Sequence, residues 1–263
     1  MTAQINHDST GVTQVVHSQP ATVSGKIREV IVEEPIAIAF NGSSAAVMMG
    51  TPSDIRDLAY GFALTEGYVS SIQEIESFEV IRHDKGFEAQ LWVTEDRADA
   101  IAARRRAMAG PVGCGLCGIE SLEQVAKSLP KAPARLNLSP SEISKAMAEI
   151  SDWQPLKERT RSTHAAGFYA PGKGIIMARE DVGRHNALDK LVGALVQEGV
   201  DTSKGAVAVT SRISLELVQK CAVLGSPLLI AASGPTSLAI ETARACGLGL
   251  IGFCRGEDYE IFC

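Results

Sequence analysis

Two cysteines lie two residues apart in a glycine-rich segment near the middle of the chain. Cys114 and Cys117 are each followed by glycine in GPVGCGLCG (110–118), and no second pair with this spacing occurs in the 263 residues. A cysteine thiolate can bind a metal, take part in a redox disulfide, or hold a terminal sulfur atom as a persulfide. This pair is therefore the first candidate for chemistry.

Two of the metal and redox alternatives need partners that this sequence lacks. A structural zinc site usually uses two such pairs, and a deaminase-type zinc site needs His-x-Glu before its cysteines. Here His164 is followed by two alanines and comes after the cysteines. A thioredoxin-type pair should follow the first strand of a βαβ unit, whereas this pair follows a charged segment. We therefore expect no bound metal.

The sulfur-carrier alternative fits the local sequence better. Persulfide chemistry needs an accessible thiol that loses its proton readily, and a position just before a helix favours the thiolate. The glycines that flank the cysteines would let the loop move: they are Gly113, Gly115 and Gly118. Because glycine-flanked cysteines rarely suit a packed core, two incidental buried cysteines are disfavoured.

A second group of candidates follows the strand-like segments after residue 160. Each apolar segment there is followed by a polar or glycine-rich loop, and three of these loops carry an arginine. The loops are EDVGRHN (180–186) with Arg184, TSR (210–212) with Arg212, SGPT (233–236) with Ser233, and CRG (254–256) with Arg255. Because ligands bind beyond the carboxyl ends of parallel strands, we predict a phosphate or pyrophosphate site at this edge. The alternative is that these are ordinary loop residues.

The first of these loops is unusually rich in functional groups. It contains Glu180, Asp181, Arg184, His185 and Asn186 within seven residues. His185 is compatible with a proton donor, a phosphate ligand or a hydrogen-bonded structural residue, so the cluster as a whole carries the prediction.

The elements that would position these residues alternate between strand and helix. We predict a hairpin at 164–178, followed by helices at 184–198, 214–224 and 235–246 and strands at 205–209, 227–232 and 248–253. Apolar strands separated by helices are typical of a parallel sheet with right-handed crossovers.

The N-terminal part has a different pattern. Strands are predicted at 26–34, 35–42 and 45–50, then a helix that is capped by Thr51 and ends near Gly67, then a hairpin that turns at 84–86. Residues 96–110 favour a solvated helix or linker, and helices are expected over 119–129 and from 139 onward. Residues 1–24 are polar and aperiodic, and we predict a disordered leader.

The composition excludes several classes of protein. A formal net charge of −6 does not favour non-specific nucleic-acid binding. No apolar run is long enough to span a membrane, and the N-terminus has no secretory-signal pattern, so a cytoplasmic protein is expected. Cys221 and Cys246 lie in apolar helical patterns and are predicted to be buried, while no role is assigned to Cys254 or Cys263 from the pattern alone.

Taken together, these residues resemble the formate dehydrogenase accessory sulfurtransferase family, FdhD/NarQ, from about residue 25 to 263. CGLCG (114–118) and EDVGRHNALDK (180–190) are the most specific motifs. The others are FNG (40–42), TP (51–52), YGFALTEG (60–67), HAA (164–166), SRISLELVQK (211–220), GPTSLA (234–239) and GFCRG (252–256). Ser211 stands where the family pattern has glycine, so phosphate binding at this loop is expected to differ from the family pattern.

The resemblance implies a sulfur carrier and its partners. A cysteine desulfurase would load a persulfide on Cys114, the first cysteine of the pair. We add Cys117 to the predicted catalytic residues, either as a resolving thiol or as a parallel relay of sulfur. The sulfur would pass to the bis-guanine-dinucleotide form of the molybdenum cofactor before its insertion into formate dehydrogenase. The resemblance places the cofactor-binding segment at Phe253, Cys254, Arg255 and Gly256, to which we add Arg184, His185, Arg212 and Ser233 from the sheet edge.

The resemblance also implies an architecture. We expect an α/β protein with a small N-terminal α+β roll over 25–110 and a cytidine-deaminase-like mixed or parallel sheet domain over 111–263, assembled as a homodimer. The main alternative function is a non-catalytic chaperone that binds the cofactor, and a third is a degenerate deaminase-fold enzyme with a metal.

Overall fold

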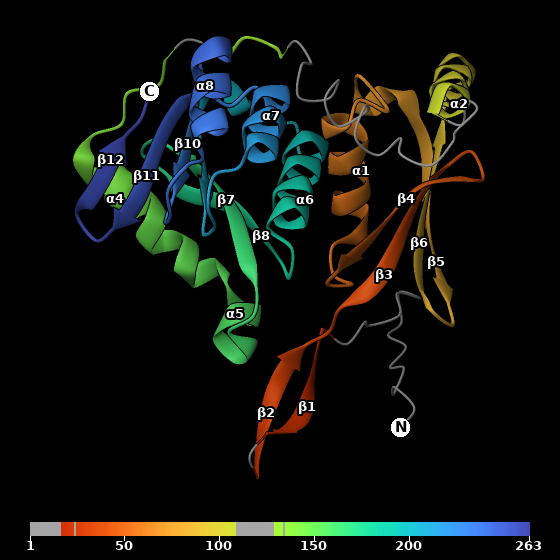
Figure 1. Ribbon diagram of the computed structural model, residues 1–263, viewed down its shortest axis with the longest axis horizontal. Helices are drawn as coiled ribbons and strands as arrows, with labels where there is room; N and C mark the ends of the chain where they lie inside the picture. The colour runs from red at the N-terminus through yellow and green to blue at the C-terminus, as the bar shows by residue number, and fades with distance from the viewer. Residues whose placement is uncertain (1–16, 24, 109–128, 134) are drawn as a thin grey trace.

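A computed structural model describes residues 17–23, 25–108, 129–133 and 135–263 (Figure 1). This part of the chain is a mixed α/β structure with three sheets, whose strand orders are β1-β2, β4-β3-β6-β5 and β12-β11-β10-β9-β7-β8. The strands are β1 (Ser18–Val23), β2 (Lys26–Ile31), β3 (Glu34–Phe40), β4 (Ser43–Gly50), β5 (Ile75–His83), β6 (Gly86–Val93), β7 (His164–Ala170), β8 (Gly174–Asp181), β9 (Ala206–Val209), β10 (Leu228–Ala231), β11 (Gly249–Arg255) and β12 (Asp258–Ile261). The α-helices are α1 (Ile55–Thr65), α2 (Glu95–Met108), α4 (Pro140–Glu149), α5 (Pro155–Thr160), α6 (Arg184–Gln197), α7 (Leu215–Leu224) and α8 (Ser237–Cys246), and the short 3-10 helices are η1 (Ile72–Glu74), η2 (Ile150–Trp153) and η3 (Thr202–Lys204).

The six-stranded sheet contains the strands and crossover helices expected after residue 160. β9, β10 and β11 are parallel, and β7 is antiparallel to both β8 and β9, so β8 runs in the same direction as these three strands. The predicted hairpin, strands and helices are confirmed, with β12 added as an antiparallel edge strand. The carboxyl ends of β8 to β11 therefore share one edge, as the anion-site argument required.

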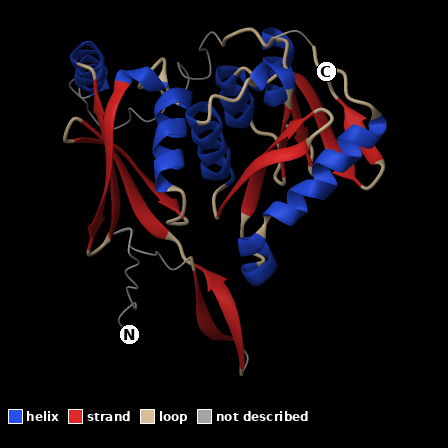
Figure 2. Cartoon of the chain, turned by 180° about the vertical axis from the view of Figure 1, so that it is seen from behind, coloured by secondary structure: helices blue, strands red, loops and turns tan. Residues whose placement is uncertain are grey.

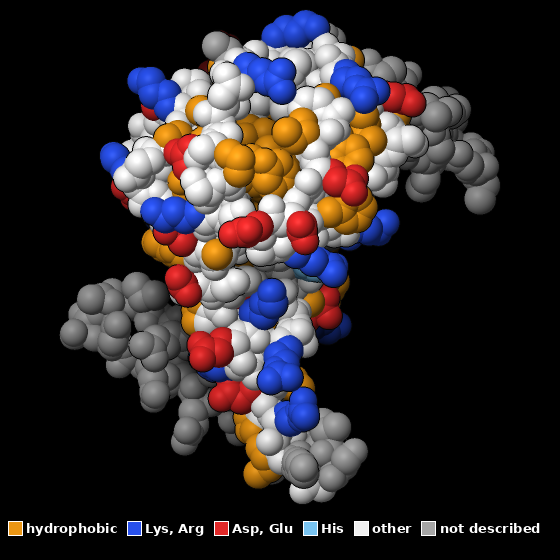
Figure 3. Space-filling model, turned by 90° about the vertical axis from the view of Figure 1, so that its left-hand side faces the viewer, with side chains coloured by type: hydrophobic (Ala, Val, Ile, Leu, Met, Phe, Trp, Pro, Cys, Tyr) orange, Lys and Arg blue, Asp and Glu red, His pale blue; other side chains and the backbone are white. Residues whose placement is uncertain are grey.

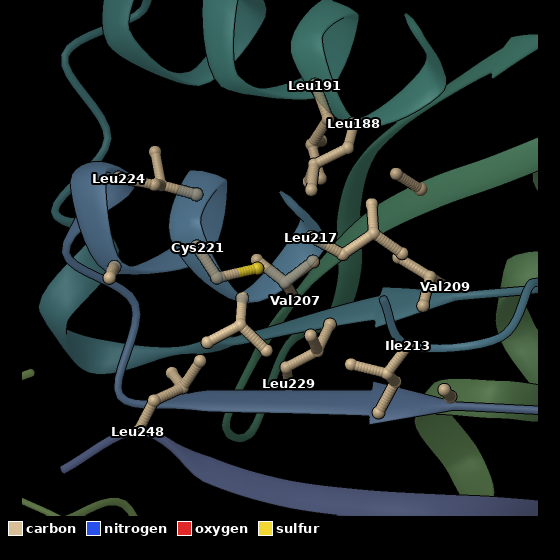
Figure 4. Packing of buried hydrophobic residues seen from close by; sticks show 14 of the residues in the cluster. Leu188, Leu191, Val207, Val209, Ile213, Leu217, Cys221, Leu224, Leu229 and Leu248 are labelled. Atoms are coloured by element: carbon tan, nitrogen blue, oxygen red, sulfur yellow. The ribbon is translucent and has the colours of Figure 1, made fainter. Parts of the chain in front are cut away.

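Helices cover both faces of this sheet. On one face, Leu188 of α6 and Leu217 of α7 pack over Val207 and Leu229 of the sheet (Figure 4). Cys221 lies within this cluster, and Cys246 is buried in it as well, so both cysteines are small core residues as predicted. The sheet is thus closed to water on this side.

The opposite face is covered by α4. Ser139 caps this helix in a capping box with Glu142, and Pro140 occupies its first turn, so the start of the helix is locally encoded. The helix contacts β8 through β11, and η2 at its end contacts β7 and β8. Figures 1 and 2 show α4 running across the sheet toward α5.

The four-stranded sheet packs against α1 around its own apolar cluster, which includes Ile38, Leu58 and Leu91. The hairpin β5–β6 and the helix α2 are confirmed. The predicted cap of α1 is wrong, because the helix begins at Ile55 after Asp54, which has a left-handed φ of 50° and no side-chain capping bond. Thr51 is fully buried instead, and its hydroxyl accepts a hydrogen bond from the backbone N–H of Val182.

Part of the predicted leader is structured. Residues 18–23 form β1, which pairs antiparallel with β2 along its whole length. The hydroxyl of Ser18 donates to the carboxylate of Glu29 at 2.9 Å, and Arg159 of α5 bonds to both side chains. The sequence of β1 is polar and has no strand periodicity, so the strand was not predicted. It is stabilised by its pairing with β2 and by the bonds to Glu29 and Arg159. The boundary predicted near residue 110 lies outside the described residues.

Helices α1 and α6 cross at two glycines and join the two larger sheets. A Cβ atom on Gly61 would lie 1.8 Å from the carbonyl oxygen of Asp189, and one on Gly193 would lie 1.9 Å from that of Asp57. Only glycine allows this backbone approach. No helix among the described residues is long and apolar enough to cross a membrane.

Candidate functional site

Much of the EDVGRHNALDK segment fastens α6 to the N-terminal part of the chain. Asp181 and Lys190 form an ion pair at 2.7 Å in which both side chains are fully buried. The second carboxylate contact is the backbone N–H of Thr51, which donates to Asp181 at 3.0 Å, and Lys190 donates to the carbonyl of Thr51 at 2.9 Å. Asn186 donates to the carbonyl of Met49 and to Asp181. These residues are therefore structural.

A second buried pair extends this junction. Lys220 of α7 donates to Asp189 of α6 at 2.9 Å and to Glu66, beyond the end of α1, at 2.8 Å. Thr65 donates its hydroxyl hydrogen to Asp189 at 2.7 Å. Burial alone would lower the pKa of Lys220, but the carboxylates of Asp189 and Glu66 raise it above its ordinary value, so Lys220 stays charged.

Arg184 and His185 are two polar members of the segment that do not join this junction. The Nε atom of Arg184 is buried without a hydrogen-bond partner among the described residues. His185 lies 3.3 Å from the hydroxyl of Ser214 and 3.8 Å from the carboxylate of Glu216. Burial, and then the charge of Arg184, lower the pKa of His185, and the same two causes lower the pKa of His164. Both imidazoles are therefore held neutral near pH 7.

A cleft with a volume of about 890 Å³ lies between α4 and the carboxyl ends of β9, β10 and β11. Its floor includes Thr210, Ala232 and Cys254, which follow or end these three strands. Arg255 and Gly256 line the end of the cleft at β11. The structure thus puts a cleft where open α/β sheets bind ligands.

The other walls of the cleft come from α4, from η2 and from the start of α5. They are Pro140, Ser141, Ser144, Lys145, Met147, Ala148, Ile150, Ser151, Gln154, Lys157 and, from the β11–β12 turn, Glu257. Three of the lining residues are cationic and one is acidic, so the charge of the lining favours an anionic ligand. Figure 3 shows the side of the molecule that carries β12, where hydrophobic side chains gather among basic and acidic ones.

The segment GFCRG has alternating environments. Phe253 has a left-handed φ of 53°, and 46% of its surface is exposed. Cys254 is buried, and burial raises the pKa of its thiol to about 11. Arg255 is exposed, and Gly256 has a φ of 60° with open space around it. The segment therefore presents a guanidinium and a free backbone turn to the cleft, with a protonated thiol beneath them.

The loops that follow β9 and β10 lie next to this segment, but several of their residues do not line the cleft. The backbone N–H of Phe253 bonds to the carbonyl of Ser233 at 3.4 Å, and the ring of Phe253 fills the space where Gly234 has no side chain. Arg212 is exposed. Arg184, His185, Arg212, Ser233 and Phe253 are absent from the lining of the cleft, which contains Cys254, Arg255 and Gly256 of the predicted set.

The comparison with known families agrees with this architecture. The FdhD/NarQ family matches residues 31–263, which is most of the chain.

The chain belongs to the FdhD/NarQ family.

Curated relatives cover nearly the whole chain. The sulfur carrier protein FdhD of Agrobacterium fabrum is 49% identical over 251 residues, which are 95% of this chain and 92% of the relative. The protein of the same name from Brucella abortus is 45% identical over 255 residues, 95% of each chain. This chain and these FdhD proteins therefore align over almost their full lengths.

A solved structure of the family has the same fold. It is the crystal structure of a protein from Desulfotalea psychrophila that was assigned as a formate dehydrogenase accessory protein, with a TM-score of 0.70 and 25% sequence identity. The alignment covers 94% of this chain and 96% of that one. The mixed α/β architecture described above is thus that of an FdhD/NarQ protein.

The two cysteines predicted to carry sulfur lie outside the described residues, so the geometry of Cys114 and Cys117 is not described. Within the described ranges, no group of three His, Cys, Asp or Glu side chains could hold a metal ion. The cleft adds Gln154 and Lys157, which no sequence motif indicates, and Thr210 of the TSR loop, for which no binding role was predicted. Only Thr210 had a signal in the sequence, because it directly follows a predicted strand.

Proposed function

We propose that this chain is a sulfur carrier that accepts sulfur from a cysteine desulfurase and passes it to the molybdenum bis-guanine-dinucleotide cofactor required by formate dehydrogenase. The observation that carries the proposal is the 49% identity, over 95% of the chain, to a protein named as a sulfur carrier. The presence of the CGLCG pair supports it, because a persulfide needs a cysteine thiolate.

In the loading step, the outer sulfur of a persulfide would pass from the desulfurase to Cys114 by nucleophilic attack of a thiolate on sulfur. The thiolate of Cys114 attacks the outer sulfur of the desulfurase persulfide, and a new S–S bond forms on Cys114. The S–S bond of the donor breaks, and its electron pair leaves with the thiolate of the desulfurase cysteine. The step moves one sulfur atom without net oxidation, so it needs no additional oxidant.

Release would use the second cysteine as a resolving thiol. The thiolate of Cys117 attacks the inner sulfur, on Cys114, and the outer sulfur leaves as hydrosulfide toward the cofactor. The product is a Cys114–Cys117 disulfide, which a cellular dithiol reductant returns to two thiols. A parallel relay through Cys117 is the alternative role for this residue.

We assign the cofactor's guanine-nucleotide portion to the cleft beside α4. Cys254, Arg255 and Gly256 line it, and Arg255 would supply a charge-assisted hydrogen bond to a phosphate. Phe253 and Ser233 support this segment, while Arg184, His185 and Arg212 lie at the same sheet edge and would add to the binding surface. The cofactor is the substrate in this scheme.

The wider setting of the proposal follows the family resemblance. We propose a cytidine-deaminase-like arrangement for the six-stranded sheet domain over 111–263 and a roll for the domain over 25–110. Cytoplasmic location, a homodimer, a transient complex with the desulfurase and delivery to formate dehydrogenase belong to the same proposal.

The first prediction tests the carrier cysteine. Cys114→Ala should fold and bind GDP like the wild-type protein, yet yield inactive formate dehydrogenase, because no persulfide forms without the thiolate. Cys117→Ala should lose activity less completely. The measurement is formate dehydrogenase activity in cells that lack the native gene and carry each variant, with equal amounts of soluble protein.

Two controls make this test decisive. Mass spectrometry after incubation with a cysteine desulfurase and cysteine should find an added sulfur on Cys114 of the wild-type protein. Full formate dehydrogenase activity with Cys114→Ala would instead show that the protein acts as a cofactor-binding chaperone or that another cysteine carries the sulfur.

A further inference from the structure

The amide nitrogen of Gln154 is a buried donor that has no hydrogen-bond partner in the part of the chain that the structure describes. Only 4% of this residue is exposed. Its oxygen accepts a hydrogen bond from the ammonium group of Lys157 at 3.3 Å, but its Nε2 atom has no hydrogen-bond partner among the described residues. An unpaired buried donor is destabilising, so its presence in a residue that lines a cleft points to a ligand that supplies the acceptor.

A buried carboxylate next to the start of α5, that of Glu180, already has partners. Glu180 accepts from the backbone N–H groups of Leu156 and Lys157 and from the hydroxyl of Thr163. Reversing the amide would place Nε2 against the ammonium group of Lys157, which is itself a donor, so the free atom is the nitrogen. Among the described residues, the amide nitrogen of Gln154 is thus available to donate a hydrogen bond to an acceptor on a ligand.

Gln154 lines the same cleft as Arg255. Gln154 and Lys157 follow η2, which contacts β7 and β8, whereas Arg255 ends β11. From β11 to β7 the sheet order crosses three strand spacings, roughly 14 Å at 4.8 Å each. This span is comparable to the extended length of a nucleoside diphosphate.

The two ends of the cleft differ in character. The turn at Arg255 and Gly256 is exposed and suits a solvated phosphate. The lining from α4 and η2 includes the apolar residues Met147 and Ile150, and Gln154 itself is buried. A flat base prefers an apolar wall with a few polar groups at its edge.

We propose that Gln154, together with Lys157, selects guanine over adenine at this end of the cleft, an inference that rests on the proposed binding of a guanine nucleotide there. The amide nitrogen and the ammonium group present donors only, because the amide oxygen is already bonded to Lys157. Guanine offers the acceptors O6 and N7 along one edge, whereas adenine places an amino donor where guanine has O6. The site therefore pairs with guanine and leaves a donor facing a donor with adenine.

The test compares GDP and ADP binding by calorimetry in the wild-type protein and in Gln154→Met, which keeps the side-chain length but removes the donor. We expect the affinity for GDP to fall about tenfold, as for one lost hydrogen bond in a buried site, while that for ADP stays within about twofold. The free variant should be at least as resistant to urea as the wild-type protein, because an unpaired buried amide is gone. Lys157→Met, at an exposed position, should lower the GDP-to-ADP preference in the same direction.

Gln197→Met is the matched control. The amide nitrogen of Gln197 is fully used, since it donates to Asp57 and to the carbonyl of Gly193, both at 2.9 Å. This variant should lose stability and keep its affinity for GDP, the opposite of the result for Gln154→Met.

The other outcomes are also decisive. An equal loss of GDP and ADP affinity in Gln154→Met would overturn base selection in favour of phosphate binding. Unchanged binding of both nucleotides in Gln154→Met would also overturn base selection by Gln154. The variant Arg255→Ala then tests the cleft assignment separately. A loss of GDP affinity in Arg255→Ala would leave the assignment of the guanine nucleotide to this cleft intact. A wild-type protein that does not bind GDP would overturn the cleft assignment and this inference together.

Discussion

Cys254 is a thiol beside the proposed cofactor site, and its surroundings restrict what it can do. It lines the cleft but is only 4% exposed, and burial raises the pKa of its thiol to about 11. A thiol attacks sulfur as the thiolate. At neutral pH Cys254 is therefore a protonated side chain, which agrees with the proposal that the cysteine pair carries the sulfur.

The second prediction measures this difference in reactivity. In a Cys114→Ser, Cys117→Ser background, alkylation of Cys254 at pH 8 should be about 1000-fold slower than that of a fully ionised thiol, because only about one thiol in a thousand is ionised three units below its pKa. The rate should rise about tenfold per pH unit as the pH approaches the pKa, as the thiolate fraction grows. Peptide mass spectrometry after timed iodoacetamide treatment gives the rate.

Two reference states complete that experiment. Cys221, fully buried in the core, should resist alkylation as long as the protein is folded, since burial also raises its pKa. In urea all cysteines should react at similar rates. Rapid labelling of Cys254 in the folded protein at pH 8 would contradict its assignment as a protonated packing residue.

At the scale of elements, the crossing of α1 and α6 decides how the two larger sheets are held. Gly61 and Gly193 bring the helix backbones together, and Asp57 beside this contact bonds to Arg179 of β8 at 2.7 Å. The crossing is therefore a close backbone contact with polar bonds at its border. A side chain at either glycine would meet backbone atoms, which cannot rotate away.

The third prediction is that Gly61→Ala destabilises the protein. In a free helix this change would gain about 1 kcal/mol of helix propensity. Here the new Cβ atom would lie 1.8 Å from the carbonyl oxygen of Asp189, and the resulting shift of α6 should cost more than the gain, for a net loss of about 1–3 kcal/mol. Urea unfolding followed by circular dichroism measures it.

The control introduces the same residue without a clash. Glu241 is exposed on α8, so Glu241→Ala should change the free energy of unfolding by less than about 0.5 kcal/mol. A Gly61→Ala protein that is as stable as the wild type would show that the two helices can separate without cost.

At the scale of the whole molecule, the N-terminal sheet and the six-stranded sheet have separate apolar clusters but share buried ion pairs. Asp181 with Lys190, and Lys220 with Asp189 and Glu66, all lie at the border between them. Separating the two sheets would expose these charged side chains to water or leave them buried without their partners. Breaking a buried ion pair is strongly unfavourable, so the two clusters should unfold together.

The fourth prediction uses the two tryptophans, which lie in different parts. Trp92 is in β6 of the N-terminal sheet and Trp153 is in η2 beside α4, and the chain has no others. Fluorescence of the single-tryptophan variants Trp92→Phe and Trp153→Phe should give coincident urea transitions. Lys190→Met should shift both by the same amount, with a loss of about 3–5 kcal/mol. Two separated transitions would show that the junction does not couple the sheets.

Much of this fold could be predicted from local patterns, and the exceptions share a cause. Helix and strand periodicity identified the α6 to β11 series nearly to the residue, because each element has its own apolar face. Thr51 was misassigned as a cap because its real partners, Asp181 and Val182, are about 130 residues away. Gln154 could not be predicted as a site residue, because the burial of its amide nitrogen without a partner results from the tertiary packing of α4 and η2 on the sheet.

In the candidate site, too, some residues could be predicted from local sequence and others could not. Arg255 and Gly256 follow a predicted strand and line the cleft, as the sheet-edge rule required. The dense polar segment at 180–190 was interpreted as a ligand site, but Asp181, Asn186 and Lys190 hold the junction with the N-terminal part. Charge and polarity in a sequence do not distinguish a buried structural network from a binding surface, since both use the same residue types.

The junction between α1 and α6 also has a consequence in time. Thr51 leaves the ribosome well before Asp181 and Lys190, which are about 130 residues further along the chain. At synthesis rates of about 5–20 residues per second, that interval lasts roughly ten seconds. During it, the glycine face of α1 and the peptide groups of Thr51 have no α6 to pair with, so the N-terminal part of each nascent chain presents an open docking surface until α6 has been synthesised.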